Sequence, residues 1–287
     1  MIQKNLLIGA HVSIAGGFYK AILCGETIGA TCIQIFTKSN RQWHAKKITQ
    51  EDIELFTTHQ KNSNIAIVVA HASYLINLGS KTEETVHKSI HALTEELQRC
   101  DALKIPYLVL HPGTLRSTDE QESLIFIADQ INTALERANP QHVTLLLETM
   151  AGQGSTAGHT FEQLATIMHH IKNKKSIGVC FDTCHAFVAG YEFNTPELYK
   201  KMWDNFDKTI GLSKLKVFHM NDSKKGLNSK VDRHEDIGKG MIGPSAFKLI
   251  MDDKRFADIP KILETPQAND IEDPKRNIAT LIRYSQQ

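Results

Sequence analysis

Residues 177–185 read IGVCFDTCH, a short apolar run that ends at Asp182 and is followed three residues later by His185. An uninterrupted apolar run is typical of a strand that is covered on both faces, as the strands of parallel sheets are. Functional groups of parallel α/β proteins lie where such strands end and the following loops begin. This stretch therefore predicts an α/β fold with a site at the carboxyl ends of its strands.

The same pattern recurs along the chain, where short apolar runs alternate with longer amphipathic stretches. The runs are Leu6–Ala10, Cys32–Phe36, Ile65–Ala70, Tyr107–Leu110, Val143–Leu147, Ile177–Phe181, Leu215–Phe218 and Lys261–Leu263. Eight strand–helix repeats favour a single (β/α)8 TIM barrel with its active site at the C-terminal strand ends. No linker or composition shift divides residues 1–287, so we expect one domain. A doubly wound open sheet is the alternative fold.

Helix starts are indicated by capping residues between the runs. A Ser or Thr followed three residues later by an acidic residue resembles a capping box, in which two side chains satisfy backbone N–H groups at the start of a helix. We expect one helix to begin within Thr49–Asp52. Two further starts are predicted from the pairs Ser80 with Glu83 and Ser117 with Glu120.

Composition narrows the class of protein. Hydrophobic residues are 41% and charged residues 23% of the 287, which permits a large core, and no run of about 18 apolar residues suggests a membrane span. The net charge of +1 argues against binding nucleic acid by bulk charge alone. The five cysteines are sparse and odd in number, and the first nine residues do not resemble a secretory signal, so we expect reduced thiols in a cytoplasmic protein.

Only His, Asp and Glu follow six consecutive apolar runs. The loop after the seventh run adds two more such residues, Asp232 and His234. The full set is His71, His111, Glu148, Asp182, His185, His219, Asp232, His234 and Glu264. Because the carboxyl ends of barrel strands converge on one mouth, we expect all nine side chains to lie together.

Five imidazoles and four carboxylates in one concavity are costly unless cations compensate them. Imidazole and carboxylate without thiolate suit Zn²⁺, with Mn²⁺ or Fe²⁺ as alternatives. Nine ligands exceed what one ion takes and suit three ions if Glu148, on a central strand, bridges two of them. Three Zn²⁺ carry about +6 against about −4 from the carboxylates, which leaves a positive hole for a phosphate. Such a cluster is typical of phosphodiester hydrolysis.

Ten blocks of sequence carry a resemblance to a known family. They are GAHVS (9–13), FTK (36–38), RQW (41–43), HASYLINLG (71–79), LHPG (110–113), LET (147–149), GVCFDTCHAFVAGY (178–191), HMNDSK (219–224), DRHEDIG (232–238) and LETP (263–266). At these residues the sequence resembles the endonuclease IV family of apurinic/apyrimidinic (AP) endonucleases. The blocks run in order through nearly the whole chain, and the seventh and ninth are the most specific.

The resemblance implies a zinc-dependent DNA-repair enzyme on a TIM barrel. Its substrate would be double-stranded DNA, cleaved 5′ to an abasic site to leave a 3′-hydroxyl and a 5′-deoxyribose phosphate, and it would also trim blocked 3′ ends. Three Zn²⁺ ions per chain are implied, with Mn²⁺ as an alternative at one site. One barrel mouth needs no partner chain to bind a duplex, so we expect a monomer.

Carried over residue by residue, the resemblance implies three ligand sets and two catalytic carboxylates, Glu148 and Glu264. Glu148 would bridge two ions and orient the attacking hydroxide, and the third ion would stabilise the departing oxygen. The implied sets are His71, His111 and Glu148; then Glu148, Asp182, His219 and Glu264; then His185, Asp232 and His234.

Loop residues are implied to handle the DNA. Arg41, Tyr74 and Leu75 would enter the duplex and fill the gap left by the extruded abasic nucleotide, where unstacking costs least. Basic residues nearby could contact phosphates; they are Lys38, Lys46, Lys47, Lys224, Lys225, Lys230 and Arg233. Many family members carry Asn two residues before the arginine. Here that position is Ser39, which puts one polar DNA contact in doubt.

Two other functions fit parts of the pattern. A sugar isomerase or epimerase on a similar barrel would use one or two metal ions and a base for hydride or proton transfer. A non-catalytic metal-binding scaffold would tolerate Glu148→Gln without loss of any activity. A metal count and an incision assay discriminate among the three.

Overall fold

The structure, a computed structural model, describes residues 6–286. Eight parallel strands form one sheet in the order β1-β10-β7-β6-β5-β4-β3-β2. The strands are β1 (Ile8–Ala10), β2 (Cys32–Phe36), β3 (Ile67–His71), β4 (Tyr107–Leu110), β5 (Thr144–Glu148), β6 (Ile177–Asp182), β7 (Leu215–His219) and β10 (Lys261–Leu263). Each predicted run overlaps one of these strands, although β3, β5, β6 and β7 extend one residue beyond it, and the succession of strands is that of a TIM barrel.

The two ends of the sheet meet between β1 and β2. His11 and Gln34 form a parallel bridge, and the Val12 N–H donates to the carbonyl of Gln34 at 2.8 Å. A Cβ at Gly9 would lie 1.6 Å from the carbonyl oxygen of Cys32, so only glycine permits this approach. The sheet therefore closes into a barrel, and the open doubly wound alternative is excluded.

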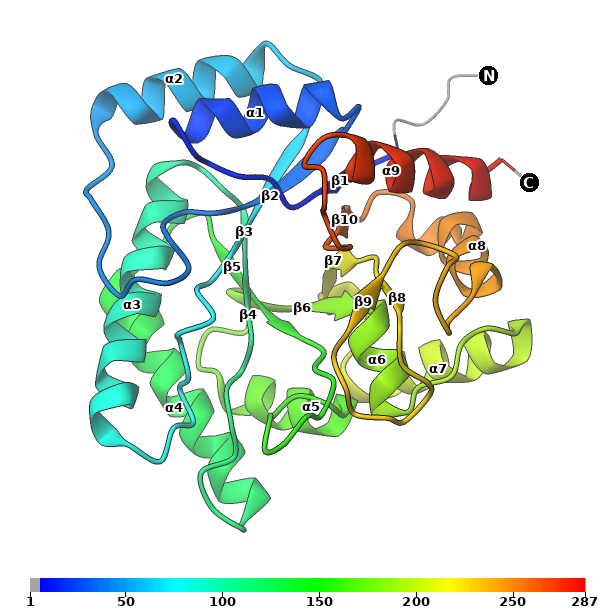
Figure 1. The fold of residues 1–287 in the computed structure, drawn as a ribbon. Helices are drawn as coiled ribbons and strands as arrows, with labels where there is room; N and C mark the ends of the chain where they lie inside the picture. Colours follow the sequence, from blue (N-terminus) through cyan, green and yellow to red (C-terminus); the bar gives the residue numbers. More distant parts are fainter. Residues whose placement is uncertain (1–5, 287) are drawn as a thin grey trace.

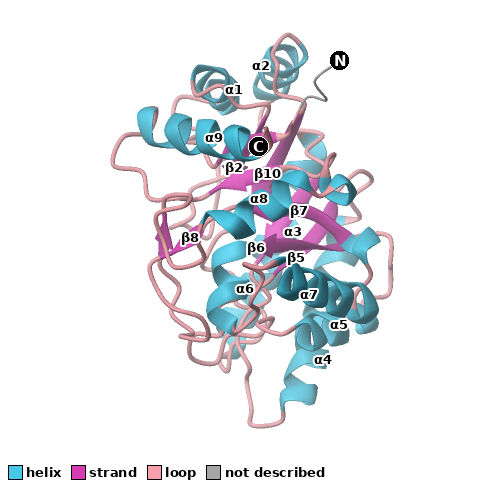
Figure 2. Ribbon diagram, turned by 90° about the vertical axis from the view of Figure 1, so that its right-hand side faces the viewer, coloured by secondary structure: helices cyan, strands magenta, loops and turns pink. Residues whose placement is uncertain are grey.

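Helices surround the strands (Figure 1). They are α1 (Phe18–Thr27), α2 (Gln50–Lys61), α3 (Glu83–Ala102), α4 (Glu120–Ala138), α5 (Phe161–His170), α6 (Thr183–Ala189), α7 (Pro196–Thr209), α8 (Pro244–Asp252) and α9 (Glu272–Tyr284). In the side view, α1 and α2 lie on one side of the strands and α4 and α5 on the other (Figure 2). The larger apolar core fills the layer between helices and strands. Among the described residues, no helix has both the length and the apolar character that a bilayer crossing requires.

One of the three predicted helix starts is confirmed, and two are wrong by about two residues. Thr49 caps α2 and forms a reciprocal capping box with Asp52. Ser80 does not cap α3, which starts after Thr82; the Ser80 hydroxyl instead accepts the Thr82 N–H. The α4 helix is capped by Asp119 rather than Ser117. In both cases a polar residue nearer the helix occupies the cap position.

The barrel interior explains where the polar residues point. A layer of small apolar side chains fills the middle of the barrel: Cys32, Val69, Val109, Leu146, Cys180, Val217 and Ile262. Successive side chains of a strand alternate between its two faces, so the residue two positions later points into the same interior, one level higher. Those residues are Gln34, His71, His111, Glu148, Asp182, His219 and Glu264. Six of the seven are predicted site residues.

A hairpin after β7 adds two further side chains to the mouth. Its strands are β8 (Asp222–Ser223) and β9 (His234–Glu235), paired antiparallel. The buried Asp222 carboxylate accepts the backbone N–H groups of Gly238, Gly240 and Ile242, which anchors the returning segment. The hairpin thereby brings Asp232 and His234 back over the strand ends.

Candidate metal centre

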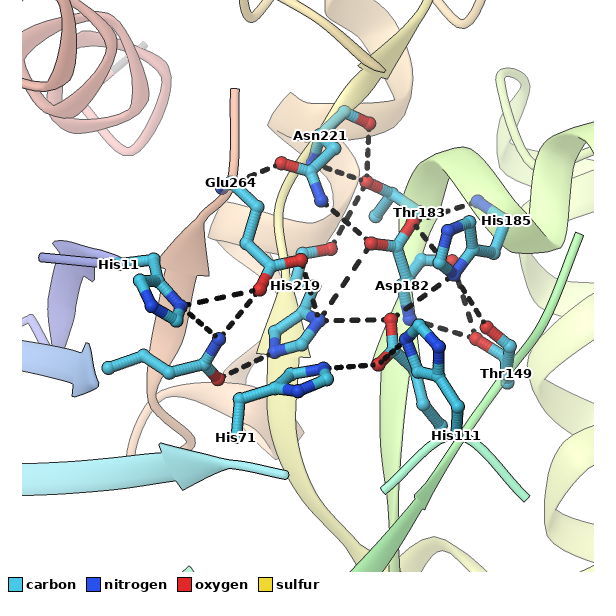
Figure 3. Close-up of polar contacts among 12 residues, drawn as sticks. His11, His71, His111, Thr149, Asp182, Thr183, His185, His219, Asn221 and Glu264 are labelled. Atoms are coloured by element: carbon cyan, nitrogen blue, oxygen red, sulfur yellow. Dashed lines mark hydrogen bonds and ion pairs between the residues drawn. The ribbon is translucent and has the colours of Figure 1, made fainter. Parts of the chain in front are cut away.

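Glu148 lies at the middle of the predicted site and is fully buried. Its Oε2 atom is 3.2 Å from Nε2 of His71 and 3.1 Å from Nε2 of His111. Its Oε1 atom is 3.1 Å from Nδ1 of His185 and 3.1 Å from Nδ1 of His219. One carboxylate thus faces four imidazoles that come from four different strand ends. The four histidines are labelled in Figure 3.

A second set of donors surrounds Nδ1 of His219. Besides Glu148, this atom faces Oε2 of Glu264 at 3.3 Å and Oδ2 of Asp182 at 3.9 Å. Asn221 orients the two carboxylate residues: its side-chain amide donates to Asp182 at 2.7 Å, and its oxygen accepts the Glu264 backbone N–H at 2.8 Å. Asp182 also caps α6 by accepting the His185 N–H at 2.8 Å, which ties the end of the strand to the start of the helix.

The third set gathers around Asp232. Its two oxygens lie 3.1 Å from Nε2 of His185 and 3.2 Å from Nε2 of His234. Both ring nitrogens are buried, yet neither is aligned for a hydrogen bond. Their other nitrogens are held by backbone carbonyls, Nδ1 of His185 at 3.0 Å from Thr149 O and Nδ1 of His234 at 2.9 Å from Glu264 O. Buried polar atoms without a hydrogen bond are rare and indicate that a ligand belongs there.

All nine predicted side chains therefore come together. The donor atoms fall into groups within which every pair of atoms lies within 4.8 Å, and three of these groups match the three ligand sets that the resemblance implies. A further group joins Cys184 to Asp182 and His234. Burial raises the pKa of the Cys184 thiol to about 12, and that of Cys180 likewise, so both cysteines stay protonated at neutral pH.

The pKa values of the donors follow from this crowding. Burial alone would raise the pKa of Glu148, but the charges of His219 and His111 outweigh it and hold the pKa well below its usual range. Burial opposes protonation of His234, yet Asp232 and then Asp182 raise its pKa to about 9. Protons on these rings neutralise the carboxylates, and a cation bound by the same atoms would displace them.

Sequence reasoning missed two residues of the site. Gln34 lies in the same layer as the donors and contacts both His219 and Glu264. A single amide inside the apolar run CIQIF is the signal that could have found it. Asn221, two residues after His219, is fully buried and positions two carboxylate residues.

The loop after β3 places Tyr74 over the site. The Tyr74 ring centroid lies 5.3 Å from that of His71 and 5.4 Å from that of His111, and 55% of the residue is exposed. Burial of its hydroxyl, with the charge of Glu264, raises the pKa of Tyr74, so the phenol remains neutral. An aromatic face is thus presented to solvent directly above the predicted ligands.

Arg41 and Leu75 line one cleft of about 530 Å³ together with Trp43. The two loops that carry them are tied to each other, because the Ser73 hydroxyl donates to the Asn40 carbonyl at 2.9 Å. The three predicted DNA-binding residues therefore belong to one connected surface at the barrel mouth.

Lys38 does not belong to that surface. Its side chain is buried, and its ammonium donates to the Trp43 carbonyl at 2.9 Å and lies 3.2 Å from Glu95 and 3.7 Å from Glu96. The prediction that Lys38 contacts phosphate is wrong, because the ammonium instead holds the loop to α3. The other predicted basic residues are exposed; they are Lys46, Lys47, Lys224, Lys225, Lys230 and Arg233.

Comparison with known proteins fits this geometry. Residues 25–287 match the family model of the xylose isomerase-like TIM barrels. A protein named "Probable endonuclease 4" from Chloroflexus aurantiacus is 45% identical over 273 residues, which cover 95% of this chain and 96% of that protein. The chain belongs to the endonuclease IV family. The crystal structure of endonuclease IV from Thermus thermophilus is 34% identical with a TM-score of 0.87, covering 97% of this chain and 98% of that one.

The barrel of the endonuclease IV family also occurs in proteins of other names. A D-tagatose 3-epimerase-like protein has a TM-score of 0.72 at 19% identity, covering 97% of this chain and 98% of that chain. That likeness concerns the fold alone. Function in such barrels follows from the residues at the strand ends.

Proposed function

We propose that the protein is a zinc-dependent endonuclease that cleaves double-stranded DNA 5′ to abasic sites, leaving a 3′-hydroxyl and a 5′-deoxyribose phosphate, and that also trims blocked 3′ ends. The observation that carries this proposal is the convergence of nine donor side chains around the buried Glu148 carboxylate. The names of the relatives support the endonuclease activity.

The residues present fit divalent cations. The unaligned buried Nε2 atoms of His185 and His234 face a shared carboxylate, and imidazole with carboxylate is a donor set that zinc prefers. The three ligand sets implied by the resemblance would hold three Zn²⁺ ions, with Mn²⁺ as an alternative at one site. When bound, such ions stabilise the negative charge of a phosphodiester and make water a nucleophile near neutral pH.

The chain's own carboxylates supply the proton acceptors. The surrounding histidines, His219 first for each, outweigh burial and hold the pKa values of Glu148 and Glu264 below the usual range, so both are ionised at neutral pH. Each can accept a proton from an attacking water at the barrel mouth. We assign the catalytic roles to these two residues.

The exposed loops supply recognition. Tyr74 and Leu75 would occupy the space of an extruded nucleotide, with Arg41 beside them and the exposed basic residues on the phosphates. One chain offers a complete mouth, so we propose that it acts as a monomer and as one domain. The five cysteines are free, in keeping with the reducing cytoplasm where we propose that it works.

The test uses a duplex that carries one tetrahydrofuran abasic analogue, incubated with protein purified without added metal and analysed on a denaturing gel. We expect one cut on the 5′ side of the lesion, none in the undamaged duplex, and about three zinc ions per chain by elemental analysis. Absence of incision by the zinc-loaded protein would overturn the proposal. One manganese or magnesium ion per chain without incision would favour the epimerase alternative.

A further inference from the structure

Gln34 is a fully buried amide on β2, within the layer of predicted donors. Its Nε2 atom donates to Oε1 of Glu264 at 2.6 Å and lies 3.0 Å from Nδ1 of His11. Its Oε1 atom is 2.8 Å from Nε2 of His219. The three residues that contact this side chain, His11, Glu264 and His219, are labelled in Figure 3.

These contacts allow only one orientation of the amide. An ionised carboxylate only accepts hydrogen bonds, so the NH₂ group of Gln34 must face Glu264. The opposite orientation would put the amide oxygen and a carboxylate oxygen 2.6 Å apart, with no proton between them. The oxygen of Gln34 therefore faces His219, and because this oxygen only accepts, Nε2 of His219 must carry a proton.

The fixed proton determines which nitrogen of His219 serves the site. With Nε2 committed to Gln34, the atom left to bind a cation is Nδ1, which faces Glu148 at 3.1 Å and Glu264 at 3.3 Å. The same amide holds the other oxygen of Glu264. A partner that fixes the tautomer and direction of a metal-binding histidine commonly changes metal affinity by about 10–100-fold.

We propose that Gln34 is a positioning residue that directs Nδ1 of His219 and the carboxylate of Glu264 toward one cation. His11 completes the arrangement by accepting from the Gln34 amide through Nδ1. This inference rests on the metal-dependent activity proposed above, but concerns one ion among three. It assigns a function to the polar residue that β2 contributes to the donor layer.

The first test counts zinc. Wild-type protein, Gln34→Leu and the control Asn132→Leu are dialysed against graded concentrations of a chelator, and bound zinc is measured. Asn132 is a buried amide on α4 that bonds to the backbone of His170 and Lys172, away from the barrel mouth. We expect Gln34→Leu to lose one zinc ion per chain at about 10–100-fold lower chelator concentration than either other protein. Equal retention in Gln34→Leu and wild type would overturn the inference.

A second measurement does not depend on how the variant folds. In wild-type protein labelled with ¹⁵N-histidine and loaded with zinc, the Nε2 resonance of His219 should be that of a protonated nitrogen, and Nδ1 that of a metal-bound one. The reverse assignment would overturn the inference.

A further variant separates the two contacts of Gln34. Gln34→Glu keeps the acceptor for His219 but opposes Glu264 with a charge, so it should keep the Nε2 proton of His219 and still lose one zinc ion.

The outcomes separate the two proposals. Wild-type protein that neither binds zinc nor cuts the abasic duplex contradicts the proposed function. Wild-type protein that does both, alongside a Gln34→Leu variant with unchanged zinc retention, contradicts the inference alone.

Discussion

Oε1 of Glu148 lies 3.1 Å from Nδ1 of His219, and both side chains are inaccessible to solvent. Glu148 faces histidines of all three donor sets: His111 of the first, His219 of the second and His185 of the third. Because Glu148 is fully buried among histidines, bulk solvent does not compensate for the loss of its charge. We therefore expect removal of the Glu148 charge to affect the site more than removal of any other single charge.

Glu148→Gln should reduce incision of the abasic duplex by more than about 100-fold, the upper end for changes one step removed from a metal. The amide keeps the shape but removes the negative charge between four histidines. Rates from the denaturing-gel assay give the comparison, and circular dichroism checks the fold. A variant with the wild-type rate and zinc content would support the scaffold alternative.

Asp232→Asn should remove the third zinc ion selectively. Asp232 is the acceptor shared by His185 and His234, and it belongs only to the third donor group. We expect the zinc count to fall by about one per chain and incision to fall at least about 10-fold. Glu235→Gln, a change beside His234 outside every donor group, is the matched control. Equal losses in both variants would point to general damage to the hairpin.

Tyr74→Ala should weaken binding to the abasic duplex while sparing the hydrolytic chemistry. Stacking of a base on an aromatic ring contributes about 1–3 kcal/mol, so the KM for the abasic duplex should rise about 10-fold or more. Tyr74→Phe keeps the ring and should resemble wild type. Hydrolysis of bis(p-nitrophenyl) phosphate, which is too small to need the loops, should stay unchanged; a matching loss there would mean that Tyr74 acts on the metal ligands.

Glu96, a buried carboxylate on α3, gives the stability of the chain a pH dependence. Burial raises its pKa to about 7, against the opposing charge of Lys38 and the Ser73 N–H that it accepts. Because the folded-state pKa is raised above the usual 4.5, the stabilising contribution is full below about pH 4.5 and is lost as the pH rises through about 7. Glu96→Gln removes this titration.

The free energy of unfolding of Glu96→Gln, relative to wild type, should therefore increase by about 1–3 kcal/mol between pH 4.5 and pH 7.5. Urea denaturation of both proteins at the two pH values measures this difference. A constant difference at both pH values would show that Glu96 does not titrate in this range.

Much of the site could be predicted because two different sequence features mark it: the end of an apolar run, and a His, Asp or Glu residue that follows it. The apolar runs stop just before His71, Glu148 and His219, and these residues are the last of their strands. The predicted runs are one residue short, because an ionisable side chain after an apolar run predicts the end of a strand. In the barrel those side chains still point into the interior, where they contact the other predicted donors.

What could not be predicted depends on contacts between distant segments. Gln34 and Glu264 are 230 residues apart, and nothing in the run CIQIF says which strand end its amide meets. Lys38 is predicted to contact phosphates with the other basic loop residues, whereas α3 places two glutamates against it. The wrong helix starts at Ser80 and Ser117 have a local cause. A polar residue two positions nearer the helix, Thr82 or Asp119, occupies the cap position instead.

The closure of the barrel at Gly9 has a consequence for how the chain acquires its metal. Donors of the second set extend from Glu148 to Glu264, and the last of them follows β10, the strand that joins β1 to β7. A chain emerging from the ribosome cannot assemble that set until its final strand is available. Filling of the second set would therefore report completion of folding, and a truncated chain ending before β10 would keep only the first and third sets.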